Sequence, residues 1–259
     1  MASVLHRYLN YVYQDMVRKR LAAQLDLVQL PATQVYLDLG CAVGYNTARV
    51  QKILKPQKTL ALEYDPQAAQ VVLARGIPVI CHDLNQPLPL CSASVDVITV
   101  LDVLEHLVET WRFLTEVYRV LKPGGVVLID SPNLAAWHNI LGLMLGVQPS
   151  SGPHLVSIAD SDWGLVEDMH RRDHQLTGQS AETVVNSKMH RHIVIPAYRS
   201  LRRVLQKAGF EVLACRGFGY YPLPPPLSDW MCRLDISHAH HYLIKARKPL
   251  RGMPLAVLS

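Results

Sequence analysis

A carboxylate beside a glycine turn is the first feature of this sequence that could do chemistry. Asp38 lies within the apolar run Val35–Leu39, and the turn Gly40-Cys-Ala-Val-Gly44 follows directly. Glycines at such a turn let a ligand approach the backbone closely. Further ionisable side chains stand just after later apolar segments: Glu63, Asp83, Asp102, Glu105 and His106. The spacing therefore indicates a row of polar groups at the ends of strands.

The segments that must position these residues alternate between strand-like and helix-like patterns. Apolar spacing over residues 3–28 predicts an N-terminal helix or helix pair. The predicted strands span 35–39, 59–64, 78–81, 95–101, 125–130, 210–216 and 241–246, and the helices between them span 47–54, 66–75, 111–121 and 198–208. Such alternation predicts an α/β fold whose mostly parallel, doubly wound sheet is covered by helices on both faces. Ligands of such sheets bind beyond the carboxyl ends of the strands, where these polar groups lie.

Composition indicates a folded protein, because 49% of the residues are hydrophobic and 18% are charged. The net charge of +5 is scattered in short clusters without interleaved aromatic residues, which argues against a nucleic-acid partner. Five cysteines without a CxxC motif indicate reduced thiols. No segment approaches the ~18 apolar residues needed to span a bilayer. We therefore expect a cytoplasmic protein.

The sequence predicts one domain over residues 1–259, divided into five parts. Residues 132–197 break the alternation, and structureless stretches of this length tend to be lids or binding loops. The expected parts are an N-terminal helical segment (1–30), a cofactor-binding half (31–133), a lid and acceptor insertion (134–197), the C-terminal part of the sheet (198–248) and a flexible tail (249–259). The Pro-rich run Tyr220–Pro226 is expected to be a stiff connecting loop.

Five motifs follow one another in register along the first half of the chain. They are Asp38-Leu-Gly-Cys-Ala-Val-Gly44, Glu63, Asp83, the run Val95–His106 and Leu121-Lys-Pro-Gly-Gly125. Together they resemble the class I S-adenosylmethionine-dependent methyltransferases of the small-molecule type. The resemblance covers about residues 30–133 well and 196–248 more faintly. It implies a Rossmann-like, seven-stranded sheet with S-adenosyl-L-methionine as cofactor and S-adenosyl-L-homocysteine as product.

The residue types suit this cofactor, which carries a sulfonium and an ammonium group but no phosphate. Asp38 would repel a pyrophosphate, whereas it can help to hold a cationic amino-acid tail. The resemblance implies that Glu63 accepts hydrogen bonds from the ribose hydroxyls and that Asp83 accepts one from the adenine amino group. The resembled family often has glycine at the position of Ala42 in this chain. The predicted cofactor-binding residues are Asp38, Gly40, Cys41, Ala42, Gly44, Glu63, Tyr64, Asp83, Leu84, Leu101 and Asp102.

The candidates for catalysis are Asp102, Glu105 and His106, just past the fourth strand. Methyl transfer is an in-line displacement that depends mainly on alignment in a dry site, and it needs a base only if the acceptor must lose a proton. His106 is the first candidate for that base, because imidazole titrates near neutral pH. A packing role for His106 against the cofactor stays open. Cys41 has no activating neighbour in the sequence and is expected to line the cofactor loop.

The predicted acceptor-binding residues follow the fifth strand or lie in the insertion: Asn133, Trp137, His138, His170 and His174. The pair in His170-Arg-Arg-Asp-His174 and the pair in His190-Arg-His192 have spacings that occur in metal sites. The arginines between His170 and His174 oppose a cation, so no metal is expected.

The apolar run Leu134–Val147 has the length of a buried or interfacial helix. It can close an apolar acceptor pocket or touch a membrane. We favour the pocket, because His138 and Asn139 interrupt the run and few cations flank it.

These observations predict a methyltransferase that acts on an oxygen or nitrogen atom of a small molecule. The alternative is a non-catalytic module that binds S-adenosylmethionine and serves as a partner or sensor. A nicotinamide-dependent dehydrogenase shares the sheet, but Gly40, Ala42 and Gly44 do not form the GxGxxG motif of such enzymes.

Overall fold

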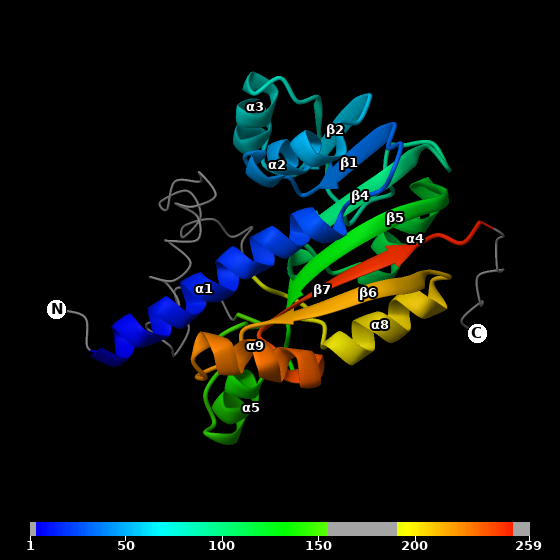
Figure 1. Cartoon of the computed structure of the whole chain (residues 1–259). Helices are drawn as coiled ribbons and strands as arrows, with labels where there is room; N and C mark the ends of the chain where they lie inside the picture. Colours follow the sequence, from blue (N-terminus) through cyan, green and yellow to red (C-terminus); the bar gives the residue numbers. More distant parts are fainter. Residues whose placement is uncertain (1–3, 155–190, 251–259) are drawn as a thin grey trace.

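A computed structural model describes residues 4–154 and 191–250, and its strands and helices alternate as the apolar periodicity predicts (Figure 1). The strands are β1 (Val35–Leu39), β2 (Lys58–Glu63), β3 (Val79–Cys81), β4 (Val95–Leu101), β5 (Leu121–Pro132), β6 (Glu211–Phe218) and β7 (His241–Arg247). The helices are α1 (Val4–Leu27), α2 (Tyr45–Leu54), α3 (Pro66–Ala74), α4 (Thr110–Val120), α5 (Trp137–Met144), α8 (Tyr198–Lys207) and α9 (Pro225–Leu234), with 3-10 turns η1 (Leu104–His106) and η4 (Ile236–His238).

The described strands form one seven-stranded sheet in the order β3-β2-β1-β4-β5-β7-β6. Strands β1 to β5 run parallel to one another, and β7 lies antiparallel between β5 and β6. This arrangement confirms the predicted doubly wound, mostly parallel sheet. The chain order reverses between β1 and β4, and the crevice beyond such a switch point is the usual ligand site of open α/β sheets.

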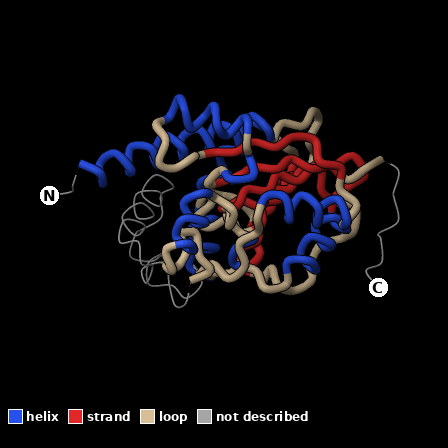
Figure 2. Tube along the Cα trace, turned by 90° about the horizontal axis from the view of Figure 1, so that it is seen from below, coloured by secondary structure: helices blue, strands red, loops and turns tan. Residues whose placement is uncertain are grey.

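Helices cover both faces of the sheet, which lies between them in Figure 2. One face packs against α1 through an apolar cluster that includes Met16, Val17 and Tyr36. The other face packs against α4 and α8, where Phe113 and Leu205 are among the buried residues. Apolar burial of this kind is the main stabilising contribution to folding, so the sheet is a firm support for the loops at its strand ends.

Two elements differ from the sequence-based expectation. Strand β5 begins at Leu121 rather than Gly125, and its pairing with β4 shifts register near Val95, which is where the added residues are accommodated. The expected stiff connector becomes helical at Pro225, the first position of α9. Proline is favoured at that position because it needs no donor there and its φ is already helical.

Candidate active site

The turn between β1 and α2 adopts backbone conformations that favour glycine. The φ angles are +74° at Gly40, +48° at Ala42 and +77° at Gly44. A Cβ atom on Gly40 would lie 2.5 Å from Cγ2 of Val103, so the turn passes directly against the segment that follows β4. The left-handed conformation of Ala42 fits a position where the resembled family often has glycine. The turn therefore joins the two central strand ends tightly.

Asp38, in the strand just before this turn, has a buried carboxylate with two hydroxyl donors. Thr47 Oγ1 and Thr99 Oγ1 each donate to it over 2.6 Å. Burial raises the pKa of Asp38 to about 6; the two threonine hydroxyls oppose the shift and the nearby Glu63 charge adds to it. A carboxylate has about four acceptor positions, so two hydroxyls leave capacity for a cationic ligand group.

Glu63, at the end of β2, ties that strand to the glycine turn. One carboxylate oxygen accepts from the backbone N–H of Ala42 over 2.7 Å, and the other accepts from Tyr64 and Asp65 over 2.8 and 2.9 Å. Burial raises the pKa of Glu63, and these backbone donors act against the shift. The structure thus places a partly buried acid beside the turn, where the resemblance implies ribose contacts.

The loop after β3 carries Asp83, Leu84 and Asn85. Asp83 Oδ1 accepts from the backbone and side-chain amides of Asn85, and Leu84 is buried. Asn85 Oδ1 in turn accepts from the backbone N–H groups of Val108 and Glu109, which connects this loop to the segment after β4. The contact expected between Asp83 and an adenine amino group stays a prediction.

Asp102 follows β4 and pairs with Arg20 of α1, a residue that the sequence analysis did not select. Arg20 Nη1 donates to both carboxylate oxygens of Asp102 over 2.6 and 2.9 Å, and it lies 3.5 Å from Asp130 Oδ2. Burial acts to raise the pKa of Asp102, but the charges of Arg20 and His241 outweigh it and hold that pKa below its usual range. Asp130 also accepts from Gln24 Nε2 over 2.6 Å. Helix α1 is therefore joined by buried polar contacts to the crevice end of β4 and β5.

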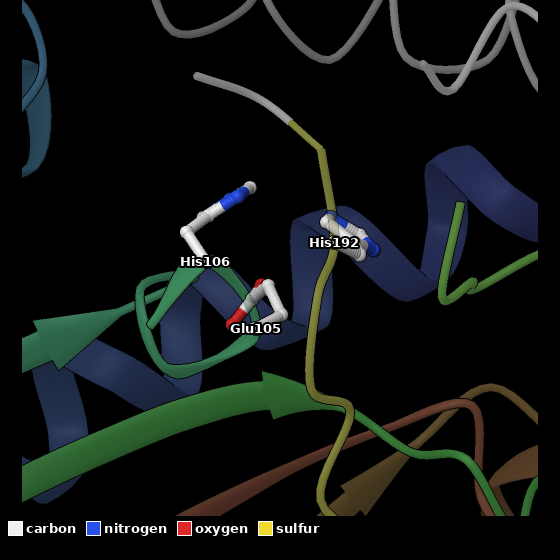
Figure 3. Close-up of side chains that lie close together, drawn as sticks. All are labelled: Glu105, His106 and His192. Carbon is white, nitrogen blue, oxygen red and sulfur yellow. The ribbon is translucent and has the colours of Figure 1, made fainter. Parts of the chain in front are cut away.

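Glu105 and His106 lie in the η1 turn and meet the segment that begins at residue 191 (Figure 3). The carbonyl of Glu105 accepts from Ile193 N–H over 2.6 Å, and His106 Nδ1 lies 3.1 Å from the Arg191 carbonyl oxygen. Burial raises the pKa of the Glu105 carboxyl and lowers that of the His106 imidazole. Burial thus favours the neutral form of each side chain. The rings of His106 and His192 are 5.0 Å apart.

The predicted acceptor residues of α5 lie in an aromatic cluster. Trp137 is 46% exposed, stacks on His238 at 4.7 Å and donates through Nε1 to Tyr220 over 2.6 Å. His138 stacks on His240 at 4.6 Å, and burial lowers its pKa to about 3. The half-exposed indole is suited to contacts with a flat or apolar acceptor.

Asn133 is placed differently from the expectation, because its amide is committed to the fold. Nδ2 donates to the carbonyl oxygens of Ser237 and Ala239, and Oδ1 accepts from the N–H groups of Ala135 and Tyr198. This set uses the full capacity of the amide. The predicted contacts of His170 and His174, and most of the proposed lid, lie outside the described residues.

Cys41 is buried, and burial raises the pKa of its thiol, which agrees with a lining role in the turn. Tyr64 is 54% exposed at the end of β2, and Leu101 is buried at the end of β4. Their expected contacts with the cofactor stay predictions.

Part of the sequence is similar to known methyltransferases. Residues 37–129 match a family described as a methyltransferase domain. A probable S-adenosylmethionine-dependent methyltransferase of Mycolicibacterium smegmatis is 39% identical over 127 residues, which are 48% of this chain and 46% of that protein. A malonyl-[acyl-carrier protein] O-methyltransferase of Herminiimonas arsenicoxydans is 32% identical over 128 residues, 49% of this chain and 47% of that protein. The matches thus span about half the length of these relatives.

Solved structures show the same fold. The N-methyltransferase NodS of Bradyrhizobium japonicum, in complex with S-adenosyl-l-homocysteine, superposes with a TM-score of 0.54 at 15% identity, covering 90% of this chain and 87% of that chain. This similarity covers the sheet as a whole, beyond the stretch that the family match includes.

The order and direction of the strands define a Rossmann-like, doubly wound fold. Residues 37–129 match the methyltransferase-domain family, and a relative of this stretch is named as a probable S-adenosylmethionine-dependent methyltransferase. In the described residues, no helix combines the length and apolar character that crossing a membrane requires.

Proposed function

We propose that the protein transfers a methyl group from S-adenosylmethionine to an oxygen or nitrogen atom of a small molecule. The observation that carries this proposal is the junction at the switch point of the sheet. There Glu63 accepts from the glycine turn, the buried Asp38 carboxylate accepts from Thr47 and Thr99, and β1 meets β4.

The residues present at this junction fit the cofactor. The close approach of Gly40 to Val103 and the positive φ angles of the turn leave a backbone cradle without side chains at Gly40 and Gly44. Asp38 would help to hold the ammonium group, and Glu63 would accept from the ribose. Carboxylates favour a cationic nucleoside and disfavour a pyrophosphate, which supports this cofactor over a dinucleotide.

S-adenosylmethionine supplies an electrophilic methyl group on its sulfonium. The main task of the protein is therefore to align the acceptor and exclude water. His106 is the candidate base: its burial favours neutral imidazole, the form that can accept a proton. Asp102 is engaged by Arg20, which fits a role in positioning the segment after β4 rather than in proton transfer. Glu105 is buried and has a raised pKa, so it is a poor proton acceptor when neutral.

Two observations support an acceptor with an oxygen atom and a flat or apolar part. One relative is named as an O-methyltransferase that acts on malonyl-acyl carrier protein, which favours an oxygen acceptor on an acyl compound. The cluster around Trp137 and His138 offers an apolar, aromatic surface, which favours an acceptor with a flat or apolar part. A cytoplasmic location stays part of this proposal and is supported by the five free cysteines of the described residues.

An acceptor panel tests the proposal. The protein is incubated with S-adenosylmethionine and, in turn, phenols, carboxylates, acyl thioesters, amines, sugars and quinones, and S-adenosylhomocysteine release is measured. Release in step with a methylated product supports the proposal. Cofactor binding without turnover on any acceptor would favour the non-catalytic module instead. In the His106→Ala variant, turnover should fall more than cofactor affinity does; unchanged turnover would reduce His106 to a packing residue.

A further inference from the structure

Glu105, His106 and His192 form a cluster that the methyl-transfer proposal does not fully use. One ligand atom from each side chain lies within 4.8 Å of the other two. Glu105 and His106 come from the η1 turn, and His192 comes from the segment that returns to the sheet 86 positions later (Figure 3). Glu105 is 1% exposed and His192 is 8% exposed, so protein encloses these two side chains, whereas His106 is half-buried.

Backbone carbonyls orient both imidazoles. His106 Nδ1 lies 3.1 Å from the Arg191 carbonyl oxygen, and His192 Nδ1 lies 2.7 Å from that of Ser151. A carbonyl cannot donate, so Nδ1 must carry the proton in both rings, and the lone pair of each neutral ring is on Nε2. Histidines that bind metals are commonly held in this way, with the second ring nitrogen donating to a carbonyl or carboxylate.

The segments that carry the three side chains are fixed to one another. The carbonyl of Glu105 accepts from the N–H groups of Ile193 and Val194, and His154 N–H donates to the carbonyl of His192. These bonds hold the segment of His192 against the η1 turn on one side and against residues 151–154 on the other. The cluster is therefore supported by three stretches of backbone, as a preorganised site requires.

The charge around Glu105 also favours a cation. Its Oε2 atom is buried and has no hydrogen-bond partner among the described residues. Asp102 and Asp130 lie near enough for their charges to act on Glu105, and Arg20 is the guanidinium that faces this group. Arg20 and His241 face Asp102 and Asp130, and a divalent cation beside Glu105 would offset the burial and the neighbouring carboxylate charges that favour its neutral form, so that it would bind as a carboxylate.

We propose that Glu105, His106 and His192 form a binding site for a divalent transition-metal ion of the zinc type. Two imidazoles and one carboxylate form a common protein ligand set for Zn²⁺, whereas Mg²⁺ and Ca²⁺ prefer oxygen ligands. Metal–ligand distances of about 2.0–2.2 Å would bring the donor atoms roughly 1 Å closer together than they are here. Two of its ligands, Glu105 and His106, are themselves predicted catalytic residues on the segment after β4, and an open coordination position could hold an acceptor oxygen.

This proposal gives His106 a role that excludes proton transfer at the same atom. Nε2 can coordinate an ion or accept a proton, so an occupied site would leave activation of the acceptor to the metal. The proposal is independent of methyl transfer, because it concerns the binding of an ion that can be measured without any turnover.

The test is a titration of the whole chain, stripped with EDTA, with Zn²⁺ by calorimetry, and with Co²⁺ by visible spectroscopy. The background carries Cys81→Ser and Cys91→Ser, because both thiols are exposed and could bind zinc themselves. We expect one tight site, with Co²⁺ bands that lack thiolate charge transfer. Glu105→Gln and His192→Ala should each weaken binding by about 100-fold or more, since even outer-shell substitutions cost 10–100-fold.

The control is Glu109→Gln, which removes an exposed carboxylate from the same segment and should leave the affinity unchanged. Circular dichroism verifies folding, and Glu105→Gln keeps the side-chain shape, so a folded variant that loses the ion supports the site. Absence of tight zinc binding in the parent protein would overturn the proposal, as would unchanged affinity in folded Glu105→Gln and His192→Ala. S-adenosylhomocysteine binding by the stripped protein reports on the cofactor crevice separately.

Discussion

Protonation of Asp38 should control the affinity for the cofactor between pH 5 and 7. The carboxylate is 3% exposed, and burial raises its pKa to about 6. A cationic amino-acid tail is attracted by the ionised form, whereas an α-amino group stays protonated throughout this range. If only the ionised form binds well, the competent fraction falls from about 0.9 at pH 7 to about 0.1 at pH 5. The affinity should therefore drop about 10-fold, or about 1.4 kcal/mol.

Calorimetric titration with S-adenosylhomocysteine at pH 5, 6 and 7 measures this effect. At pH 6 binding should release about half a proton per site, which appears as a dependence of the heat on the ionisation enthalpy of the buffer. The Asp38→Asn variant keeps the shape of the side chain and should bind weakly with a flatter pH profile. The reasoning is refuted if the wild-type affinity is the same at pH 5 and pH 7 in protein that circular dichroism shows to be folded at both.

The same carboxyl gives an independent check on the protein without ligand. A raised pKa means that folded Asp38 binds more protons than unfolded Asp38 between about pH 4 and 6. Its contribution to stability is therefore full below pH 4 and is lost as the pH rises through 6. A shift from 3.8 to about 6 corresponds to about 3 kcal/mol. Denaturant unfolding should show this loss in the wild type and a smaller pH dependence in Asp38→Asn.

Substitutions at three further positions test other parts of the site. Glu63→Gln should weaken S-adenosylhomocysteine binding ~10–100-fold in calorimetry, because charged hydrogen bonds are lost; unchanged affinity would contradict the ribose contact. Gly40→Ala should lower the unfolding free energy by about 1–3 kcal/mol, since its Cβ would lie 2.5 Å from Val103 Cγ2; a stable variant with normal cofactor affinity would refute the tight turn. Arg20→Met should lower the free energy of unfolding by about 3–5 kcal/mol, because buried Asp130 loses the cation beside it. Arg20→Lys should restore part of this stability. An unchanged free energy of unfolding in Arg20→Met would show that the pair of Arg20 and Asp130 is dispensable.

The sheet was predictable because its strands are short apolar runs bounded by turn residues. Val35–Leu39 and Val95–Leu101 have the predicted bounds, since both lie in the centre of the sheet and are apolar nearly throughout. The end of the Pro-rich run was predicted as loop, although Pro225 begins a helix. Proline marks helix starts and loops alike, so composition alone favoured the wrong element there.

The acids at the strand ends were predictable, but their partners were not. Arg20 lies 82 positions from Asp102, and no pattern in the sequence joins them. A signal did exist, because Arg20 and Gln24 fall on the buried face of α1 together with Met16 and Ala23. A charged residue on such a face predicts a buried partner.

Asn133 shows the opposite limit of prediction. Its position after β5 suggested an acceptor contact, whereas its amide binds four backbone groups, one in its own loop and three in two other segments. An asparagine at a strand end can contact a ligand or hold the backbone in place. The packing of residues distant in sequence decides which role it takes, and the sequence pattern does not show that packing.

The central claim is that the crevice at the switch point holds S-adenosylmethionine, and a crystal structure of the protein with S-adenosylhomocysteine tests it most directly. The account predicts ligand density over the turn Gly40–Gly44, with the ribose hydroxyls at the Glu63 carboxylate and the amino group on the side of Asp38. Density for the ligand at another surface, with this turn and both carboxylates untouched, would contradict it.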